Sequence, residues 1–197
     1  MKNRKILPLF VWSMLTMTSV YGQNLIVNSS FEEYSVPCSQ VHGAGRIYDA
    51  LGWERATRIF SMASDLICPC AIQGFNSPQN LVGFQEPKFG TNYGFLGFLL
   101  DWANQNNKQF LIESVQPRIN QSLIPNTCYT IEFDLSLADY SDEDWDFGLD
   151  LYFSKEDFTM PVYSNPGIIP QYSFGRMDTL SKSQWRRMSM EEVFTDT

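Results

Sequence analysis

The stretch that decides the fold covers residues 129–137 and reads YTIEFDLSL. Apolar and aromatic side chains occupy every second position, and polar side chains occupy the positions between them. Because successive side chains of a strand point to opposite faces, this alternation predicts a strand with one buried and one solvated face. Residues 147–153 repeat the alternation. Together the two stretches predict an antiparallel sheet.

Five further stretches are weaker strand candidates, and short runs rich in Asn, Pro and Gly separate them. They are residues 25–31, 81–85, 93–100, 110–115 and 185–194. Many short strands with frequent turn signals predict an all-β fold, specifically an antiparallel β-sandwich. Helical spacing over 49–62 is interrupted by Gly52, so at most one short helical turn is expected there.

Length and charge limit the class of protein. The chain has 197 residues, which suits one domain, and this domain is expected to cover 23–197. The formal net charge is −8, which argues against nucleic acid as the main partner, because phosphate binding needs clustered Lys and Arg. The single histidine, His42, argues against a zinc site built from several histidines.

Residues 1–22 are expected to be a secretory signal peptide. Three basic residues precede an uncharged, mostly apolar run over 6–20, and Val20 and Gly22 fit a small-residue cleavage site. The alternative is an uncleaved anchor, but the run is shorter than the ~20 residues a membrane span needs. Cleavage would change the net charge from −8 to −11. No later stretch reaches spanning length, so no transmembrane span is expected in the mature chain.

All four cysteines lie beyond the signal peptide, and an even number in an exported chain indicates disulfides. A bridge between Cys68 and Cys70 is disfavoured because only Pro69 separates them. Cys38 is therefore expected to pair with Cys68 or Cys70. Cys128 either takes the remaining partner or stays buried and reduced. A zinc site at Cys68 and Cys70 is the disfavoured alternative, because no second ligand pair lies nearby.

The start of the exported part, NLIVNSSFEE over 24–33, resembles the opening of galactose-binding-like jelly-roll domains. More specifically, the chain resembles modules of Bacteroidota surface proteins. The matching pieces are FEEY at 31–34, Cys38, GW at 52–53, Cys68 or Cys70, GFQE at 83–86, TCYTIEF at 127–133, SLAD at 136–139 and GLDLYFS at 148–154. The order Pro37-Cys38 departs from the Cys-Pro order of those modules.

This resemblance implies a jelly-roll sandwich that is exported to the cell surface, the outer membrane or the extracellular space. Members usually continue through another strand, so the chain either ends on its final strand or is truncated at the C-terminus. In related carbohydrate-binding jelly rolls the Glu of this opening helps to bind a structural calcium ion, which makes Glu32 a candidate metal ligand here.

A second calcium candidate is an acidic run, because Ca²⁺ takes several oxygen ligands. The run consists of Asp139, Asp142, Glu143, Asp144 and Asp146. It lacks the spacing of a known calcium loop. A solvated connection between the two alternating strands is therefore the favoured interpretation. No other cofactor is expected.

Aromatic side chains offer a sugar-binding surface. A flat ring can stack on the apolar face of a pyranose while polar groups hold its hydroxyls. The candidates are Tyr93, Trp102, Tyr140 and Trp145. Trp102 lies in a polar loop, and Tyr140 and Trp145 lie among the residues of the acidic run. Trp53, in the Gly-Trp pair, is expected in the core.

Catalysis is not expected. A glycosidase needs two carboxylates ~5–10 Å apart, and nothing in the sequence brings together Glu86 and Asp139, the pair that could be proposed. His42 lies in a Gly-rich loop without a nucleophile elbow. The sequence therefore predicts a non-enzymatic surface module that binds a glycan or another extracellular polymer. A structural or adhesive spacer of a larger outer-membrane protein is the alternative, and a polysaccharide hydrolase is the least favoured function.

Overall fold

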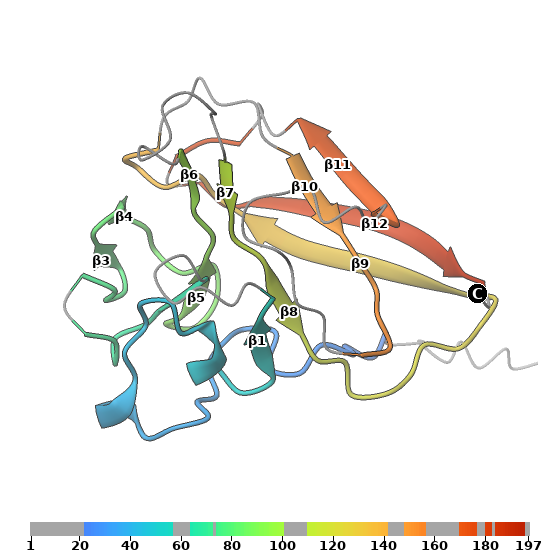
Figure 1. Ribbon diagram of the computed structural model, residues 1–197, viewed down its shortest axis with the longest axis horizontal. Coiled ribbons are helices and arrows are strands. Elements are labelled where there is room, and N and C mark those ends of the chain that lie inside the picture. Colours follow the sequence, from blue (N-terminus) through green and yellow to red (C-terminus); the bar gives the residue numbers. More distant parts are fainter. Residues whose placement is uncertain are drawn as a thin grey trace, which may run out of the picture.

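The computed structural model describes residues 22–56, 64–72, 74–100, 110–141, 148–156, 170–176, 180–182 and 184–195. These residues form an all-β chain in which the helical elements are two 3-10 turns (Figure 1). The turns are η1 (Cys38–Gln40) and η2 (Ile47–Asp49). The strands are β1 (Trp53–Arg55), β2 (Asp65–Ile67), β3 (Gln79–Asn80), β4 (Gly83–Phe84), β5 (Tyr93–Phe95), β6 (Phe98–Leu100), β7 (Phe110–Ile112), β8 (Val115–Pro117), β9 (Thr127–Leu135), β10 (Gly148–Leu151), β11 (Tyr172–Arg176) and β12 (Arg186–Phe194).

Every strand of the described residues pairs antiparallel with one other strand. The ladders are β1–β8, β2–β5, β3–β4, β6–β7, β9–β12 and β10–β11. The prediction of an all-β antiparallel fold is confirmed. Within this part of the chain, no helix has the length and hydrophobicity to cross a bilayer. The expected signal peptide lies outside the described residues except for Gly22.

The longest ladder joins β9 and β12, with Thr127 opposite Phe194 and Leu135 opposite Arg186. The alternation that predicted β9 is visible in its burial, because exposed and half-buried residues alternate from Thr127 to Phe133. The expected strand at 185–194 is confirmed as β12. Its Met190, buried, lies opposite Ile131, so one face of this ladder is apolar.

The β10–β11 ladder packs against that apolar face through aromatic rings. Phe174 of β11 meets Phe133 of β9 edge to face, with ring centroids 4.9 Å apart. Phe153, two residues after β10, meets Phe194 of β12 in the same way at 4.7 Å. Edge-to-face pairs of this kind add to the stabilisation from burial. The two ladders therefore contact each other through these rings, and Figure 1 shows β10–β11 beside β9–β12.

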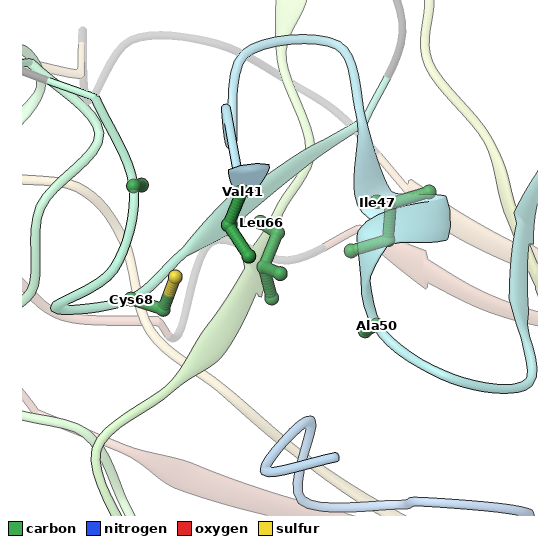
Figure 2. Packing of buried hydrophobic residues seen from close by; sticks show 6 residues of the cluster. Val41, Ile47, Ala50, Leu66 and Cys68 are labelled. Atoms are coloured by element: carbon green, nitrogen blue, oxygen red, sulfur yellow. The ribbon is translucent and has the colours of Figure 1, made fainter. Parts of the chain in front are cut away.

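A separate apolar cluster organises the first half of the chain. Its buried members are Val41, Ile47, Ala50, Leu66, Cys68 and Ala71 (Figure 2). Trp53 packs against this cluster and stacks on Phe31 with centroids 4.2 Å apart, so the expectation that Trp53 lies in the core holds. Gly43 lies at φ +81°, and a Cβ there would stand 2.6 Å from the Leu66 carbonyl oxygen, so the close approach of these segments needs glycine.

The disulfide joins Cys38 to Cys70, with an S–S distance of 2.05 Å. The predicted pairing of Cys38 is thus confirmed, and Cys70 is unavailable to zinc. Cys68 is buried and free, and burial raises the pKa of its thiol. Cys128 is free and exposed, so the expectation that it takes a partner or stays buried is wrong. It lies on the solvated face of β9, between the half-buried Thr127 and Tyr129.

Some of the weaker strand predictions are wrong. Residues 25–31 contain only an isolated bridge at Ile26 followed by a turn. The Asn28 carboxamide causes this turn, because it donates to the Glu33 carbonyl oxygen (2.8 Å) and accepts from the Glu33 N–H (3.0 Å). Local bonds of this kind compete with strand pairing.

Two other predicted strands differ in detail, and one strand was not predicted. Residues 81–85 form a turn and β4, because β3 and β4 make a two-stranded hairpin. Residues 93–100 divide into β5 and β6. β11 was not predicted. The limit of one short helical turn within 49–62 agrees with residues 49–56, which contain only the last residue of η2.

Candidate functional site

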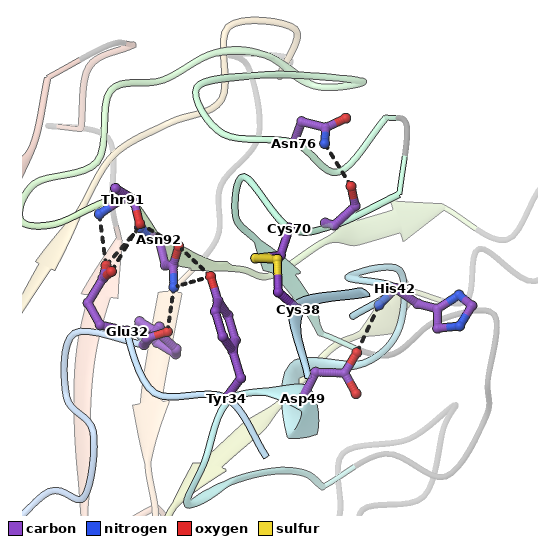
Figure 3. The surroundings of a disulfide bond; sticks show 11 residues. Glu32, Tyr34, Cys38, His42, Asp49, Cys70, Asn76, Thr91 and Asn92 are labelled. Atoms are coloured by element: carbon purple, nitrogen blue, oxygen red, sulfur yellow. Dashed lines mark hydrogen bonds between the residues drawn. A yellow bond between two sulfur atoms is a disulfide. The ribbon is translucent and has the colours of Figure 1, made fainter. Parts of the chain in front are cut away.

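Glu32 is a loop-stabilising residue in the structure (Figure 3). Its Oε1 accepts hydrogen bonds from the backbone N–H groups of Thr91 (2.8 Å) and Asn92 (2.9 Å). Its Oε2 accepts from the Thr91 hydroxyl (3.0 Å). A Cβ at Gly90 would overlap the carboxylate, so glycine is needed there. All of these bonds come from N–H and O–H donors, and within the described residues no group of three or more His, Cys, Asp or Glu side chains could hold a metal ion.

Asn92, whose backbone N–H binds Glu32, also makes side-chain hydrogen bonds to the opening segment. Its Nδ2 donates to the carbonyl oxygen of Phe31 (2.7 Å), and its side chain also bonds the hydroxyl of Tyr34 (Figure 3). Burial raises the pKa of Tyr34 to about 12. Glu32 and Asn92 together hold the opening segment of the domain against the residues that lead into β5.

Tyr93 is an interior residue. It is 8% exposed, and its hydroxyl accepts a hydrogen bond from Asn80 Nδ2 (2.7 Å). Its ring meets Trp185 edge to face at 5.8 Å, and burial raises its pKa to about 12. In this position the ring packs between strands and does not offer a face to a ligand.

Tyr140 has the opposite environment, because 74% of its surface is exposed. Its backbone N–H donates to the carbonyl oxygen of Val82 (3.2 Å). The neighbouring Asp139 carboxylate accepts from the N–H of Phe84 (2.8 Å). Gly83, the residue between Val82 and Phe84, has a φ of +126°, and a Cβ there would overlap Asp139. The exposed ring is therefore held on a backbone that is fixed at two points.

The β3–β4 hairpin, which the Tyr140 N–H contacts through the Val82 carbonyl oxygen, carries two further exposed apolar side chains. Leu81 is 68% exposed and Phe84 is 44% exposed. We refer to Leu81, Phe84 and Tyr140 as the hairpin platform. The hairpin turn is fixed internally, because Asn80 Oδ1 accepts from the Val82 N–H (2.9 Å). Exposed apolar side chains on an ordered backbone can contribute to a binding site.

Polar residues directly follow the β3–β4 hairpin in sequence. Glu86 is exposed, while Gln85 is buried and accepts from the Ser136 hydroxyl (2.7 Å). The carbonyl oxygen of Glu86 accepts from Trp185 Nε1 (2.6 Å), which connects the segment after the hairpin to the residue before β12. Asp139 uses one carboxylate oxygen to hold the hairpin, which is a structural role. His42 is exposed as expected, and its backbone N–H donates to Asp49 (3.0 Å).

Trp102 and Trp145 lie outside the described residues, as do Asp142, Glu143, Asp144 and Asp146. Leu81 and Phe84 were missed as site residues because 81–85 read as a strand. The signal that could have found them is Asn80 followed by Gly83, since both residue types favour turns. A scan against protein-family models and searches of the curated proteins and of the solved structures found no match for this chain.

Proposed function

We propose that this chain is a non-enzymatic recognition module that binds a glycan at the hairpin platform. The observation that carries the proposal is the Tyr140 ring, 74% exposed on a backbone fixed to Val82. An amphipathic ring of this kind can stack on the apolar face of a sugar while its hydroxyl stays in water. Because the backbone is already ordered, binding would cost little conformational entropy.

We also propose that the fold is a galactose-binding-like jelly-roll sandwich of an exported surface protein. The packing of β10–β11 on the apolar face of β9–β12 supports a sandwich. The Cys38–Cys70 disulfide supports export, because disulfides persist in oxidising compartments. The motif resemblance and the signal-like N-terminus support the same location.

The test is a broad glycan array followed by affinity measurement on the strongest hit. Tyr140→Ala should weaken binding by ~10-fold or more, which corresponds to about 1.4 kcal/mol. Tyr140→Phe keeps the ring and should stay within a few-fold of the original affinity. Ile124→Ala is the matched control, because Ile124 is 59% exposed on the loop before β9.

Three outcomes would contradict the proposal. A folded protein that binds no glycan on the array would favour a structural or adhesive spacer. Equal affinity of Tyr140→Ala and the original chain would move the site away from the platform. Turnover of a polysaccharide by the pure protein would identify a hydrolase.

A further inference from the structure

Two acidic side chains outside the platform, Asp65 and Glu113, lie in segments that touch each other. Asp65 begins β2, and Glu113 directly follows β7. The Ser64 hydroxyl donates to the carbonyl oxygen of Ser114 (2.8 Å), so the residue before Asp65 contacts the residue after Glu113. The N–H of Ala56, after β1, donates to the same carbonyl oxygen (3.3 Å). The end of β1, the start of β2 and the end of β7 therefore meet beside the two carboxyl groups.

Each carboxylate also binds a backbone N–H of a glycine from another segment. Asp65 accepts from Gly45, in the loop before η2. Glu113 Oε2 accepts from Gly97 (2.6 Å), at the point where β5 ends and β6 has not begun. The Asp65–Glu113 pair thus connects the loop before η2 and the β5–β6 bend to the ends of β2 and β7.

Burial dominates the electrostatics of the pair. It raises the pKa of Asp65 to about 6 and that of Glu113 to about 7, and the negative charge of Asp65 raises the pKa of Glu113 further. The N–H groups of Gly45 and Gly97 act in the opposite direction. Like charges held close in a partly buried place cannot both ionise without cost.

Two neighbouring guanidinium groups contact residues outside the pair. Arg46, next to Gly45, forms an ion pair with the buried Asp49 (2.9 Å). The Arg55 guanidinium, at the end of β1, lies over the Tyr48 ring at 5.4 Å from its centroid. Among the described residues, Asp65 is the charged group that acts on Glu113.

We propose that Asp65 and Glu113 form a proton-dependent junction that is tight while the pair holds a proton and loosens when both side chains are ionised. The folded chain binds this proton more strongly than the unfolded chain, whose carboxyl groups titrate near 3.8 and 4.5. The contribution of the pair to stability is therefore greatest at low pH, falls as the pH rises from about 4 to about 7, and is constant above that range.

The experiment is urea unfolding of the full chain at a series of pH values from 4.5 to 8. The original chain should lose at least ~10-fold in its folding equilibrium constant across this range through the pair. Glu113→Gln should remove the share of that loss that comes from Glu113, because a neutral amide cannot ionise. Burial still raises the pKa of Asp65, so a smaller pH dependence should remain. Glu132→Gln, on the exposed face of β9, is the matched control and should keep the original pH dependence.

The same pH dependence in Glu113→Gln and in the original chain would overturn the proposal. If Glu113→Gln does not fold, NMR titration of the side-chain carboxyl carbons of the original chain gives the answer. Midpoints above 5 for Asp65 and Glu113 support the junction, and midpoints near 4 for both overturn it. Neither readout involves a glycan, so the result is independent of the proposed binding function.

Discussion

At the scale of single residues, carboxylates in this chain serve as hydrogen-bond acceptors for distant backbone. Glu32 holds Thr91 and Asn92, and Asp139 holds Phe84. In each case one side chain fixes a turn that lies more than fifty residues away in the sequence. Removal of such a side chain leaves backbone donors without their partners, which costs more than the bond itself contributes.

Glu32→Ala is therefore expected to lower the free energy of unfolding by ~1–3 kcal/mol. Glu33→Ala is the matched control, because Glu33 is the exposed neighbour and should change little. Chemical denaturation of the two variants measures the difference. Adding calcium to the original chain tests the expectation from the family resemblance. A calcium-dependent rise in Tm that Glu32→Ala loses would show that this carboxylate also binds the ion.

Gly83→Ala is expected to disturb the hairpin platform. The residue lies at φ +126°, and the added Cβ would overlap Asp139, so a cost of ~1–3 kcal/mol is expected from backbone strain. Asp139 would move, and Tyr140 with it, so glycan affinity should fall together with Tm. Asp139→Asn keeps an acceptor for the Phe84 N–H and should preserve both. Unchanged affinity in folded Gly83→Ala would show that the geometry of this turn does not determine binding.

At the scale of the elements, the Cys38–Cys70 disulfide closes a loop around the first apolar cluster. The two cysteines are 32 residues apart in sequence, and η1, η2, β1 and β2 lie between them. The bond restricts the unfolded chain and so stabilises the folded one.

The double variant Cys38→Ser, Cys70→Ser is expected to lose ~3–4 kcal/mol of stability by the chain-entropy account of loop closure. Cys128→Ser should leave stability unchanged, because that thiol is exposed and unpaired. Thermal unfolding of both variants, with and without a reducing agent, provides the comparison. Reduction should lower the Tm of the original chain and of Cys128→Ser but not that of the double variant.

A strand can be predicted from the sequence when its own residue pattern determines where it begins and ends. It cannot be predicted in this way when contacts with distant residues determine its ends. β9 and β12 were predictable because their apolar residues alternate and one face of their ladder is covered. Residues 93–100 also looked like one strand, but a distant carboxylate, Glu113, takes the Gly97 N–H where β5 ends. No local pattern contains that contact. Tyr140 was predicted as a site residue, but Leu81 and Phe84 were not. The turn residues Asn80 and Gly83 indicate the hairpin locally, whereas the contact of Asp139 with Phe84 comes from far along the chain.

The candidate site was only partly predictable. Exposure separates Tyr140 from Tyr93, and sequence cannot distinguish them because both are tyrosines beside Asn, Asp or Gly. Tyr93 contacts Asn80, in the β3–β4 hairpin, and Trp185, just before β12, and these two residues are about a hundred positions apart in sequence. The sequence left Cys68 and Cys70 as the two possible disulfide partners of Cys38. Cys68 packs into the apolar cluster, and Cys70 forms the bond with Cys38.

At the scale of the whole molecule, two properties depend on acidic residues: the net charge of the surface and the change of stability with pH. The formal net charge is −8, so anionic partners are repelled over the surface as a whole. Because the Asp65–Glu113 pair favours the folded state at low pH, mildly acidic conditions should give the tightest fold. Glycan-binding measurements at pH 5.5 and 7.5 would show whether the platform responds to this change.

The exposed thiol of Cys128 has a practical consequence. Of the four cysteines, two form the disulfide and Cys68 is buried, so a maleimide reagent under non-reducing conditions should modify one position. That position faces solvent on β9, whereas the platform is carried by the β3–β4 hairpin and the segment after β9. A fluorophore or a biotin linker could be attached there without substitution of any residue. Immobilised in this way, every molecule would have the same orientation on a sensor surface.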